Sequence, residues 1–459
     1  MKINKLLIPV AILVVTVISI YSLITTNMKK NDEYNQTLLY ARDYASQGIV
    51  DDAVKYYEKA IKLNCTVDTY IEYVNVYVDN GYSKKAMRVA EQMVKDINNS
   101  PAAYECLLER YIELKLYEEC FQLDDEVKSK RLRSDGFAEK MANIEYTYAQ
   151  DYQSYNAVNN FSGGFASVKS DDLYGVIDET GKRILNKSYT EAGCFSYFTN
   201  KNNKDDSGYV MPVCTKEGNW MYISNKGNKK IDIDEELKFD YLGLYVDNSL
   251  TAASNAGKYA YYDENFEKKL GDYEYASTFN CGCAAVKTGD KEWYIINENG
   301  EKLNSNPYSD VVLDSKEIAF RNNRAFVMKD GSYYMIDTSC KEIGDKSFTD
   351  AKPFYNTIRS DKKSTEELPI LAAVCSEGKW GFVDTDCNFV IEPSFQDAHS
   401  FSFSYAAVNQ NGQWGFIKSD GSVVIECSFD DVGDFNSKGC VFINTKSRWM
   451  LIKLYKYNH

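Results

Sequence analysis

Two stretches of the chain repeat almost the same phrase. Residues 377–398 read EGKWGFVDTDCNFVIEPSFQDA, and residues 411–432, offset by 34 positions, read NGQWGFIKSDGSVVIECSFDDV. Each copy contains short apolar runs that favour β structure, separated by turns rich in Gly, Asn and Asp, and this pattern is typical of strands joined by hairpins. The repeat therefore predicts a small antiparallel sheet that the chain builds more than once.

Two series of residues extend this pattern over residues 151–459. The first is an aromatic residue near the start of the second strand of each unit, and all five Trp belong to it. The second is an aromatic residue followed three positions later by a small or aliphatic one. Together they indicate about eight units. The first series comprises Tyr174, Trp220, Tyr259, Trp293, Tyr333, Trp380, Trp414 and Trp449, and the second begins at Tyr155, Tyr189, Phe239, Tyr273, Tyr308, Phe348, Phe395 and Phe429.

The Trp-Gly pair itself is interpreted as architecture rather than chemistry. A Gly beside a large ring allows a neighbouring backbone to approach closely. In weaker copies the Gly is lost, as at Trp220-Met221 and Trp293-Tyr294, but the ring remains. A packed core accepts a change in the shape of one residue, whereas a catalytic motif would lose its function with its partner residue. The motif therefore indicates a repeated core position.

Two assemblies of these units are considered. Repeated small sheets close into a propeller-like ring or stack as an open β-solenoid. The last unit stops near its second strand, whereas the first is preceded by its own aromatic phrase at Tyr155. Such offset ends favour the ring, because the two ends of the domain would complete one sheet.

Three phrases are similar to a known repeat. GKWGFVD at 378–384, GQWGFIK at 412–418 and LYGVID at 173–178 resemble the bacterial WG (KWG) repeat family. The resemblance covers about 300 residues and is strong in three units. It implies a β-rich repeat domain without a generally assigned activity, often in membrane-associated or surface proteins.

Residues 34–150 show a different, helical repeat. The segment YARDYASQGIVDDAVKYYEKAIKLN, at 40–64, carries apolar and small residues at helical spacing. It recurs with a period of about 33 or 34 residues and resembles the tetratricopeptide repeat, although the third copy departs at Lys115 and Asp124. The aligned positions are Tyr44, Tyr77 and Tyr111, then Gly48 and Gly81, then Ala53, Ala86 and Cys120.

The tetratricopeptide resemblance implies a short curved stack with a concave face. Its first helices would direct Arg42, Asn75, Asp79, Glu109 and Glu113 toward that face. These residues are the predicted groove for a partner peptide. The alternative is a spacer or oligomerisation stack in which the same charges are only solvated.

The N-terminal segment suggests a membrane anchor. Residues 6–24 are apolar and uncharged, long enough at 1.5 Å per residue to cross a bilayer. No small-residue cleavage site follows, so an uncleaved signal anchor is preferred over a removed signal peptide. Lys2 and Lys5 favour an N-terminus inside the cell, which would place the bulk of the chain outside the cytoplasm, at the cell membrane.

Composition and motifs argue against several function classes. The net charge of −14 disfavours nucleic-acid binding, and the protein has only two His, His399 and His459. His399 is expected in a surface loop. Asp384, Asp386 and Asn388 resemble the start of a calcium loop, but the Gly and Glu that such a loop requires are missing. The sequence therefore predicts no catalytic residue, metal site or cofactor.

The expected protein is thus multidomain. A single transmembrane helix in residues 1–33 precedes an all-α solenoid in 34–150 and an all-β repeat domain in 151–459. Two repeat modules without a catalytic constellation favour a non-enzymatic protein-interaction scaffold at the cell envelope with a protein partner. The alternative is a protein that binds cell-wall or extracellular glycan through Tyr and Trp rings of the β domain.

Overall fold

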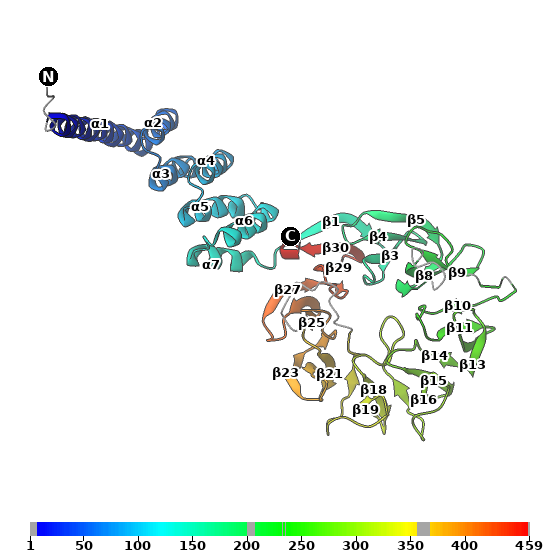
Figure 1. The fold of residues 1–459 in the computed structure, drawn as a ribbon. Helices are drawn as coiled ribbons and strands as arrows, with labels where there is room; N and C mark the ends of the chain where they lie inside the picture. The colour runs from blue at the N-terminus through cyan, green and yellow to red at the C-terminus, as the bar shows by residue number, and fades with distance from the viewer. Residues whose placement is uncertain (1–6, 200–206, 232, 235, 356–367, 458–459) are drawn as a thin grey trace. The chain divides into compact units, whose positions relative to one another are not determined.

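The computed structural model describes residues 7–199, 207–231, 233–234, 236–355 and 368–457. The chain divides into a helical unit, Met1–Thr147, and a β unit, Tyr148–Tyr457 (Figure 1). The division falls before the expected 150/151 boundary because Tyr148–Tyr155 is a strand of the β unit.

Seven helices make up the described part of the helical unit (Figure 1). Tight turns join the two helices of the first three hairpins, and Gly48, Gly81 and Lys115 hold equivalent places there with φ of +72°, +75° and +57°. This left-handed conformation suits Gly, so Lys115 keeps the backbone of the repeat at a steric cost. The helices are α1 (Leu7–Ser46), α2 (Val50–Leu63), α3 (Val67–Asp79), α4 (Ser83–Asp96), α5 (Pro101–Glu113), α6 (Tyr117–Lys130) and α7 (Asp135–Ile144).

The hairpins pack through small residues and tyrosines. Ala53, Ala86 and Cys120, which align in the sequence, are each fully buried. Tyrosine rings fill the space beside them, and their hydroxyls donate to carboxylates on neighbouring helices, which satisfies a polar group at the edge of the core. These bonds join Tyr57 to Glu72 at 3.1 Å, Tyr70 to Asp96 at 2.5 Å, Tyr104 to Glu126 at 2.7 Å and Tyr111 to Glu91 at 3.2 Å.

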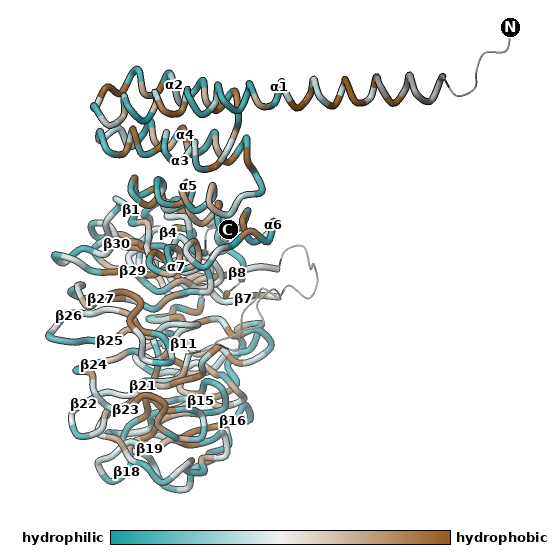
Figure 2. Tube along the Cα trace, turned by 90° about the vertical axis from the view of Figure 1, so that its left-hand side faces the viewer, coloured by the Kyte–Doolittle hydropathy of each residue, from teal (hydrophilic) through white to brown (hydrophobic). Residues whose placement is uncertain are grey.

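The predicted membrane anchor in residues 1–33 is wrong. Within the described residues, no helix is both long enough and apolar enough to cross a membrane. The apolar run belongs to α1, one helix of 40 residues that continues into a polar half packed against α2 (Figure 2). The hydroxyl of Thr16 within the run, and those of Thr25 and Thr26 just after it, donate to backbone carbonyls of the helix. Lys2 and Lys5 lie outside the described residues.

Eight small antiparallel sheets form the β unit, which is an eight-bladed propeller (Figure 1). We number the blades in chain order. Blade 1 contains β2 (Ala157–Val158), β3 (Phe165–Ser170), β4 (Leu173–Asp178) and β5 (Arg183–Tyr189); blade 2 contains β6 (Glu191–Ala192), β7 (Ser196–Phe198), β8 (Gly208–Cys214) and β9 (Trp220–Ser224); blade 3 contains β10 (Tyr241–Leu242), β11 (Thr251–Asn255), β12 (Lys258–Tyr262) and β13 (Lys268–Tyr273); blade 4 contains β14 (Tyr275–Ala276), β15 (Cys283–Gly289) and β16 (Glu292–Asn297).

The remaining blades follow the same plan. Blade 5 contains β17 (Asp310–Val311), β18 (Arg324–Lys329) and β19 (Ser332–Asp337); blade 6 contains β20 (Asp350–Ala351), β21 (Ala372–Ser376), β22 (Lys379–Val383) and β23 (Phe389–Phe395); blade 7 contains β24 (Asp397–Ala398), β25 (Ala406–Gln410), β26 (Gln413–Ile417) and β27 (Val423–Phe429); blade 8 contains β28 (Asp431–Val432), β29 (Cys440–Thr445), β30 (Arg448–Leu454) and the first strand of the unit, β1 (Tyr148–Tyr155).

The ring closes through blade 8. Strand β1 pairs antiparallel with β30, and Tyr155 lies opposite Trp449. The two ends of the domain thus complete one sheet, which confirms the propeller-like ring and excludes the open solenoid.

The core lies between neighbouring blades. One cluster joins Phe326 and Met335 of blade 5 to Val374 and Val383 of blade 6, and the other clusters repeat this arrangement around the ring. Each blade therefore buries one face against the next, so no blade has a complete core of its own.

The two aromatic series meet in the structure. The aromatic at the start of the second strand lies directly across the sheet from the aromatic that ends the same unit, and the pair closes the outer edge of the blade. Seven blades have such a pair: Tyr174 with Tyr189, Tyr259 with Tyr273, Trp293 with Tyr308, Tyr333 with Phe348, Trp380 with Phe395, Trp414 with Phe429, and Trp449 with Tyr155.

Candidate functional site

Blade 2 lacks this closure. Its equivalent aromatics are Trp220 and Phe239, and within the described residues no bridge or backbone hydrogen bond joins them. Strand β9 pairs with β8 on one edge. On its other edge β9 is paired only toward its C-terminal end. There Ile223 forms a bridge with Lys229, and the Lys230 N–H donates to the Tyr222 carbonyl at 3.1 Å.

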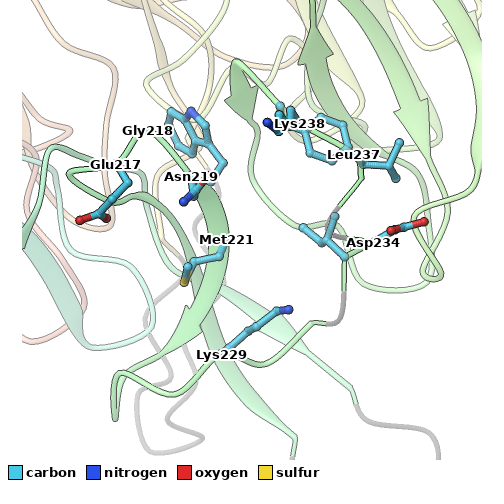
Figure 3. Close-up of a pocket in the computed structure, with 11 residues that line it drawn as sticks. Glu217, Gly218, Asn219, Met221, Lys229, Asp234, Leu237 and Lys238 are labelled. Carbon is cyan, nitrogen blue, oxygen red and sulfur yellow. The ribbon is translucent and has the colours of Figure 1, made fainter.

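A cavity of about 600 Å³ occupies the place of the missing pair, and we call it the blade 2 cavity. Figure 3 shows residues of β9 and its preceding turn on one wall and Asp234, Leu237 and Lys238 on the other. Apolar side chains and charges of both signs line it. The lining residues are Glu217, Gly218, Asn219, Trp220, Met221, Lys229, Ile233, Asp234, Leu237, Lys238 and Phe239.

Different partners hold the two aromatics apart. Phe239 packs against Tyr262 and Phe266 of blade 3, with ring centroids 5.2 and 6.1 Å away. The Trp220 ring instead contacts Tyr241, at 5.6 Å.

The spacing of the aromatics explains the opening and is visible in the sequence. Fifteen positions separate the paired aromatics of blades 1, 4, 5, 6 and 7, and fourteen separate those of blade 3. Nineteen positions separate Trp220 from Phe239. The longer connection allows Phe239 to pack against blade 3 instead of pairing with Trp220. The unusual spacing can be read from the sequence alone.

The backbone of Trp220 faces the cavity. The Thr215 N–H donates to the Asn219 carbonyl at 2.9 Å, so this pair is hydrogen-bonded across β8 and β9. In an antiparallel ladder the next pair, Cys214 with Trp220, has its N–H and C=O groups directed away from the partner strand. In blade 4 the same groups of Trp293 bond to Tyr308, with both distances 2.9 Å. In blade 2 they face the cavity instead.

A second, smaller pocket of about 200 Å³ lies near the propeller axis. The loop 312–323, which follows β17, covers it by contacting several blades. Lys316 Nζ donates to Ser162 Oγ of blade 1 at 2.8 Å, and the Thr278 N–H of blade 4 donates to the Glu317 carbonyl at 2.8 Å. Trp220 lines this axial pocket as well as the blade 2 cavity, together with Asn159, Glu191, Cys194, Tyr241, Lys316 and Glu317.

Burial dominates the electrostatics of the axial pocket. It raises the pKa of the Glu317 carboxyl, although the Tyr241 hydroxyl donates to that carboxylate at 2.7 Å. Burial also lowers the pKa of Lys316 and raises that of the Cys194 thiol. Beside them Arg321 and Asp314, both in the loop 312–323, form a buried ion pair at 2.5 Å that joins the two ends of the loop.

His399 lies outside the strands, in the loop that follows β24, as the sequence predicts, and 27% of its side chain is exposed. Its Nδ1 lies 3.0 Å from Asp434 Oδ1, and its ring contacts Trp414 at a centroid distance of 4.8 Å. Burial opposes the charge of the imidazole, but the Asp434 hydrogen bond outweighs it and the pKa of His399 is raised. The nearby Ser402 hydroxyl donates to the Phe435 carbonyl at 2.8 Å, so His399 does not hold it as a nucleophile.

The residues that resembled a calcium loop form a turn. Asp384 Oδ1 accepts the N–H groups of Asp386 and Asn388 at 2.9 and 2.8 Å. Among the described residues, no group of three or more His, Cys, Asp or Glu side chains is placed to hold a metal ion.

The five predicted groove residues lie on the first helices of the hairpins. Arg42 on α1 pairs with Glu72 on α3 at 2.6 Å. On α5, Glu113 lies 3.1 Å from Arg110, and Glu109 lies 3.3 Å from Lys140 of α7. Asn75 and Asp79 are exposed on α3. Three of the five thus contact charged neighbours within the stack, and their role in binding stays a prediction.

Three stretches of the β unit match the family described as WG containing repeat: residues 261–291, 380–414 and 414–449. The last two overlap the phrases at 378–384 and 412–418. The phrase LYGVID at 173–178 lies outside the matched stretches. The helical unit carries no such match, so its tetratricopeptide character remains a resemblance.

Several solved structures are similar to this chain in fold. The computationally designed Ika8 protein is 10% identical with a TM-score of 0.42, and the match covers 66% of this chain and 97% of that one. BamB from Moraxella catarrhalis is 9% identical with a TM-score of 0.37, covering 67% and 100%. KlHsv2 with loop 6CD replaced by a Gly-Ser linker is 9% identical with a TM-score of 0.34, covering 65% and 98%. A comparison with curated proteins finds no match.

Proposed function

We propose that the protein is a non-enzymatic protein-interaction scaffold whose main binding surface is the blade 2 cavity. One observation carries this proposal. An aromatic pair closes seven blades, whereas Trp220 and Phe239 stand on two sides of a cavity of about 600 Å³.

The surface chemistry of the cavity supports a protein ligand. Its lining combines the apolar side chains of Trp220, Met221 and Leu237 with carboxylates and ammonium groups. Protein interfaces likewise combine apolar and polar side chains. A strand edge with unpaired backbone groups adds donors and acceptors that another chain can satisfy.

A blocking substitution tests the proposal on the full-length protein. Leu237→Arg places a long charged side chain in the cavity and should abolish co-purification of the partner from the source cells. Val390→Arg, on the exposed face of β23 in a closed blade, is the matched control and should leave the partner bound. Equal recovery with both variants would refute the cavity as the binding surface.

The axial pocket favours glycan binding as a second candidate function. Trp220 and Tyr241, whose rings are in contact, line this pocket together with Glu191 and Asn159. Aromatic faces with nearby carboxylate and amide groups suit a sugar ring and its hydroxyls. Calorimetric titration of the full chain with soluble cell-wall glycan fragments tests it. Binding that Glu191→Gln weakens and Leu237→Arg leaves unchanged would place the sugar at the axis, and no heat with any fragment would remove this candidate.

A further inference from the structure

We propose that the ligand of the blade 2 cavity is an extended peptide that pairs with β9 at Trp220 and supplies the missing end of the outer strand of the blade. This inference rests on the proposed scaffold function and names the partner's contacting element. The peptide would carry an aromatic side chain, Tyr or Phe, at the position opposite Trp220.

The backbone of β9 provides the first argument. The outward N–H and C=O of Trp220 are the groups that bond to the outer segment in closed blades. In blade 5 the equivalent Tyr333 donates to and accepts from Phe348, with both distances 2.9 Å. A peptide in the cavity would make the same two bonds, and main-chain bonds of this kind give strand addition its affinity.

The other seven blades provide the second argument, because they show what fits opposite the ring. In six of them the residue that lies across from the second-strand aromatic is the Tyr or Phe that ends the unit, and in blade 8 it is Tyr155 of β1. Blade 8 is the closest precedent, since its outer strand comes from a distant part of the chain. Blade 2 would receive the end of this strand from another molecule.

The third argument concerns size. The outer strands β5, β23 and β27 are each seven residues long. At the usual rise of a strand, about 3.3 Å per residue, such a segment is about 23 Å long. In blade 2 the backbone of Lys229 and Lys230 already pairs with Ile223 and Tyr222, so only the Trp220 end of the β9 edge is open. We therefore expect the peptide to replace only the end of such a strand, equivalent to residues 426–429 of β27.

The probe for this inference is a peptide copied from the protein itself. Glu-Ser-Ser-Phe reproduces the end of β27, residues 426–429, with Ser in place of Cys427, and is acetylated and amidated at its ends. A fluorescent label allows its binding to the full-length protein to be measured by anisotropy. The same peptide with an N-methyl group on the Phe amide cannot donate the bond to the Trp220 carbonyl, and a third peptide carries Ala in place of Phe.

Strand addition predicts that the parent peptide binds. The N-methyl peptide and the Ala peptide should each bind at least about tenfold more weakly, because one edge hydrogen bond or one ring contact is worth about 1.4 kcal/mol. Leu237→Arg should abolish binding, and Val390→Arg should not change it. Hydrogen exchange of the Trp220 amide should slow when the peptide is bound.

Two results would overturn the inference. Equal affinity of the N-methyl and parent peptides would show that no backbone pairing occurs. Failure of the parent peptide to bind, while Leu237→Arg still abolishes recovery of the natural partner, would leave the scaffold function in place and remove strand addition. Loss of both effects would instead refute the scaffold proposal itself. The comparison of peptides uses the wild-type protein, so it does not depend on the folding of a variant.

Discussion

Gly381 and Gly415, the second residues of the two Trp-Gly pairs, are fixed by a close approach of backbone. A Cβ atom at Gly381 would lie 2.6 Å from the Ile391 carbonyl oxygen, and one at Gly415 would lie 2.5 Å from that of Ile425. The outer strand bulges at this point, between the residues opposite Trp380 and Phe382. Blades 4 and 5 have no bulged outer strand, and there Tyr294 and Tyr334 replace the Gly without a clash. In blade 3 the outer strand also shifts register at this point, but there Ala260 holds the position and the glycine is Gly271 on the outer strand.

This contact predicts a specific cost for Gly381→Ala. The methyl group must push the backbone of β23 away, so we expect a loss of about 1–3 kcal/mol in the free energy of unfolding. Gly208→Ala is the control, because nothing lies within 4 Å of its added Cβ atom. Urea unfolding of both variants measures the difference. Equal stability of the two would show that the backbone of β23 yields freely.

His399 predicts a pH dependence. Its pKa in the folded protein is raised above the ordinary value of 6.5, so its stabilising bond to Asp434 is complete below that value and is lost as the pH rises through the folded pKa. The stability difference between the wild type and His399→Gln should therefore shrink as the pH rises above 6.5. Urea unfolding on both sides of this pH measures it, and a constant difference would contradict the prediction.

At the scale of the element, the helices depend on tyrosine hydroxyls that bond to carboxylates. Tyr70→Phe removes the bond to Asp96 and keeps the buried ring. Because Asp96 is exposed, solvent limits the loss, and we expect about 1 kcal/mol. Tyr82→Phe, on an exposed ring, is the control and should change stability less. Thermal unfolding followed by helical circular dichroism compares them.

Much of the fold could be predicted at this scale, and the exceptions have physical causes. The two aromatic series located every blade because each series marks a fixed packing position. The sequence could not show that α1 continues past its apolar run into the stack, because the nearly uniform apolar residues 6–24 have no helical periodicity that connects them to the repeat. The two aromatic series alone do not predict the blade 2 cavity, because blade 2 has both aromatics. The sign of the cavity is their separation, which is nineteen positions instead of fourteen or fifteen. The axial pocket was out of reach, because Lys316 contacts Ser162 across 154 positions.

At the scale of the whole β unit, stability depends on the pairing of β1 with β30. Tyr155 is buried and lies opposite Trp449 and against Phe442, at 6.4 Å. Tyr155→Ala should therefore cost about 3–5 kcal/mol and open the ring at blade 8 first. Tyr152→Ala, on the same strand with its side chain fully in solvent, is the matched control. Hydrogen exchange should be faster in β30 of the first variant alone, and uniform acceleration around the ring would contradict this order of opening.

The closure through blade 8 also has a consequence during biosynthesis. Gln150 of β1 and Met450 of β30 are separated by 300 positions. At a translation rate of about 5–20 residues per second, β1 leaves the ribosome about 15–60 seconds before its partner has been made. Throughout that interval β1 is an unpaired strand, and by its end blades 1 to 7 have been made while the ring is still open. The nascent chain is therefore most vulnerable to aggregation late in its synthesis, when a chaperone that shields β1 would have the greatest effect on yield.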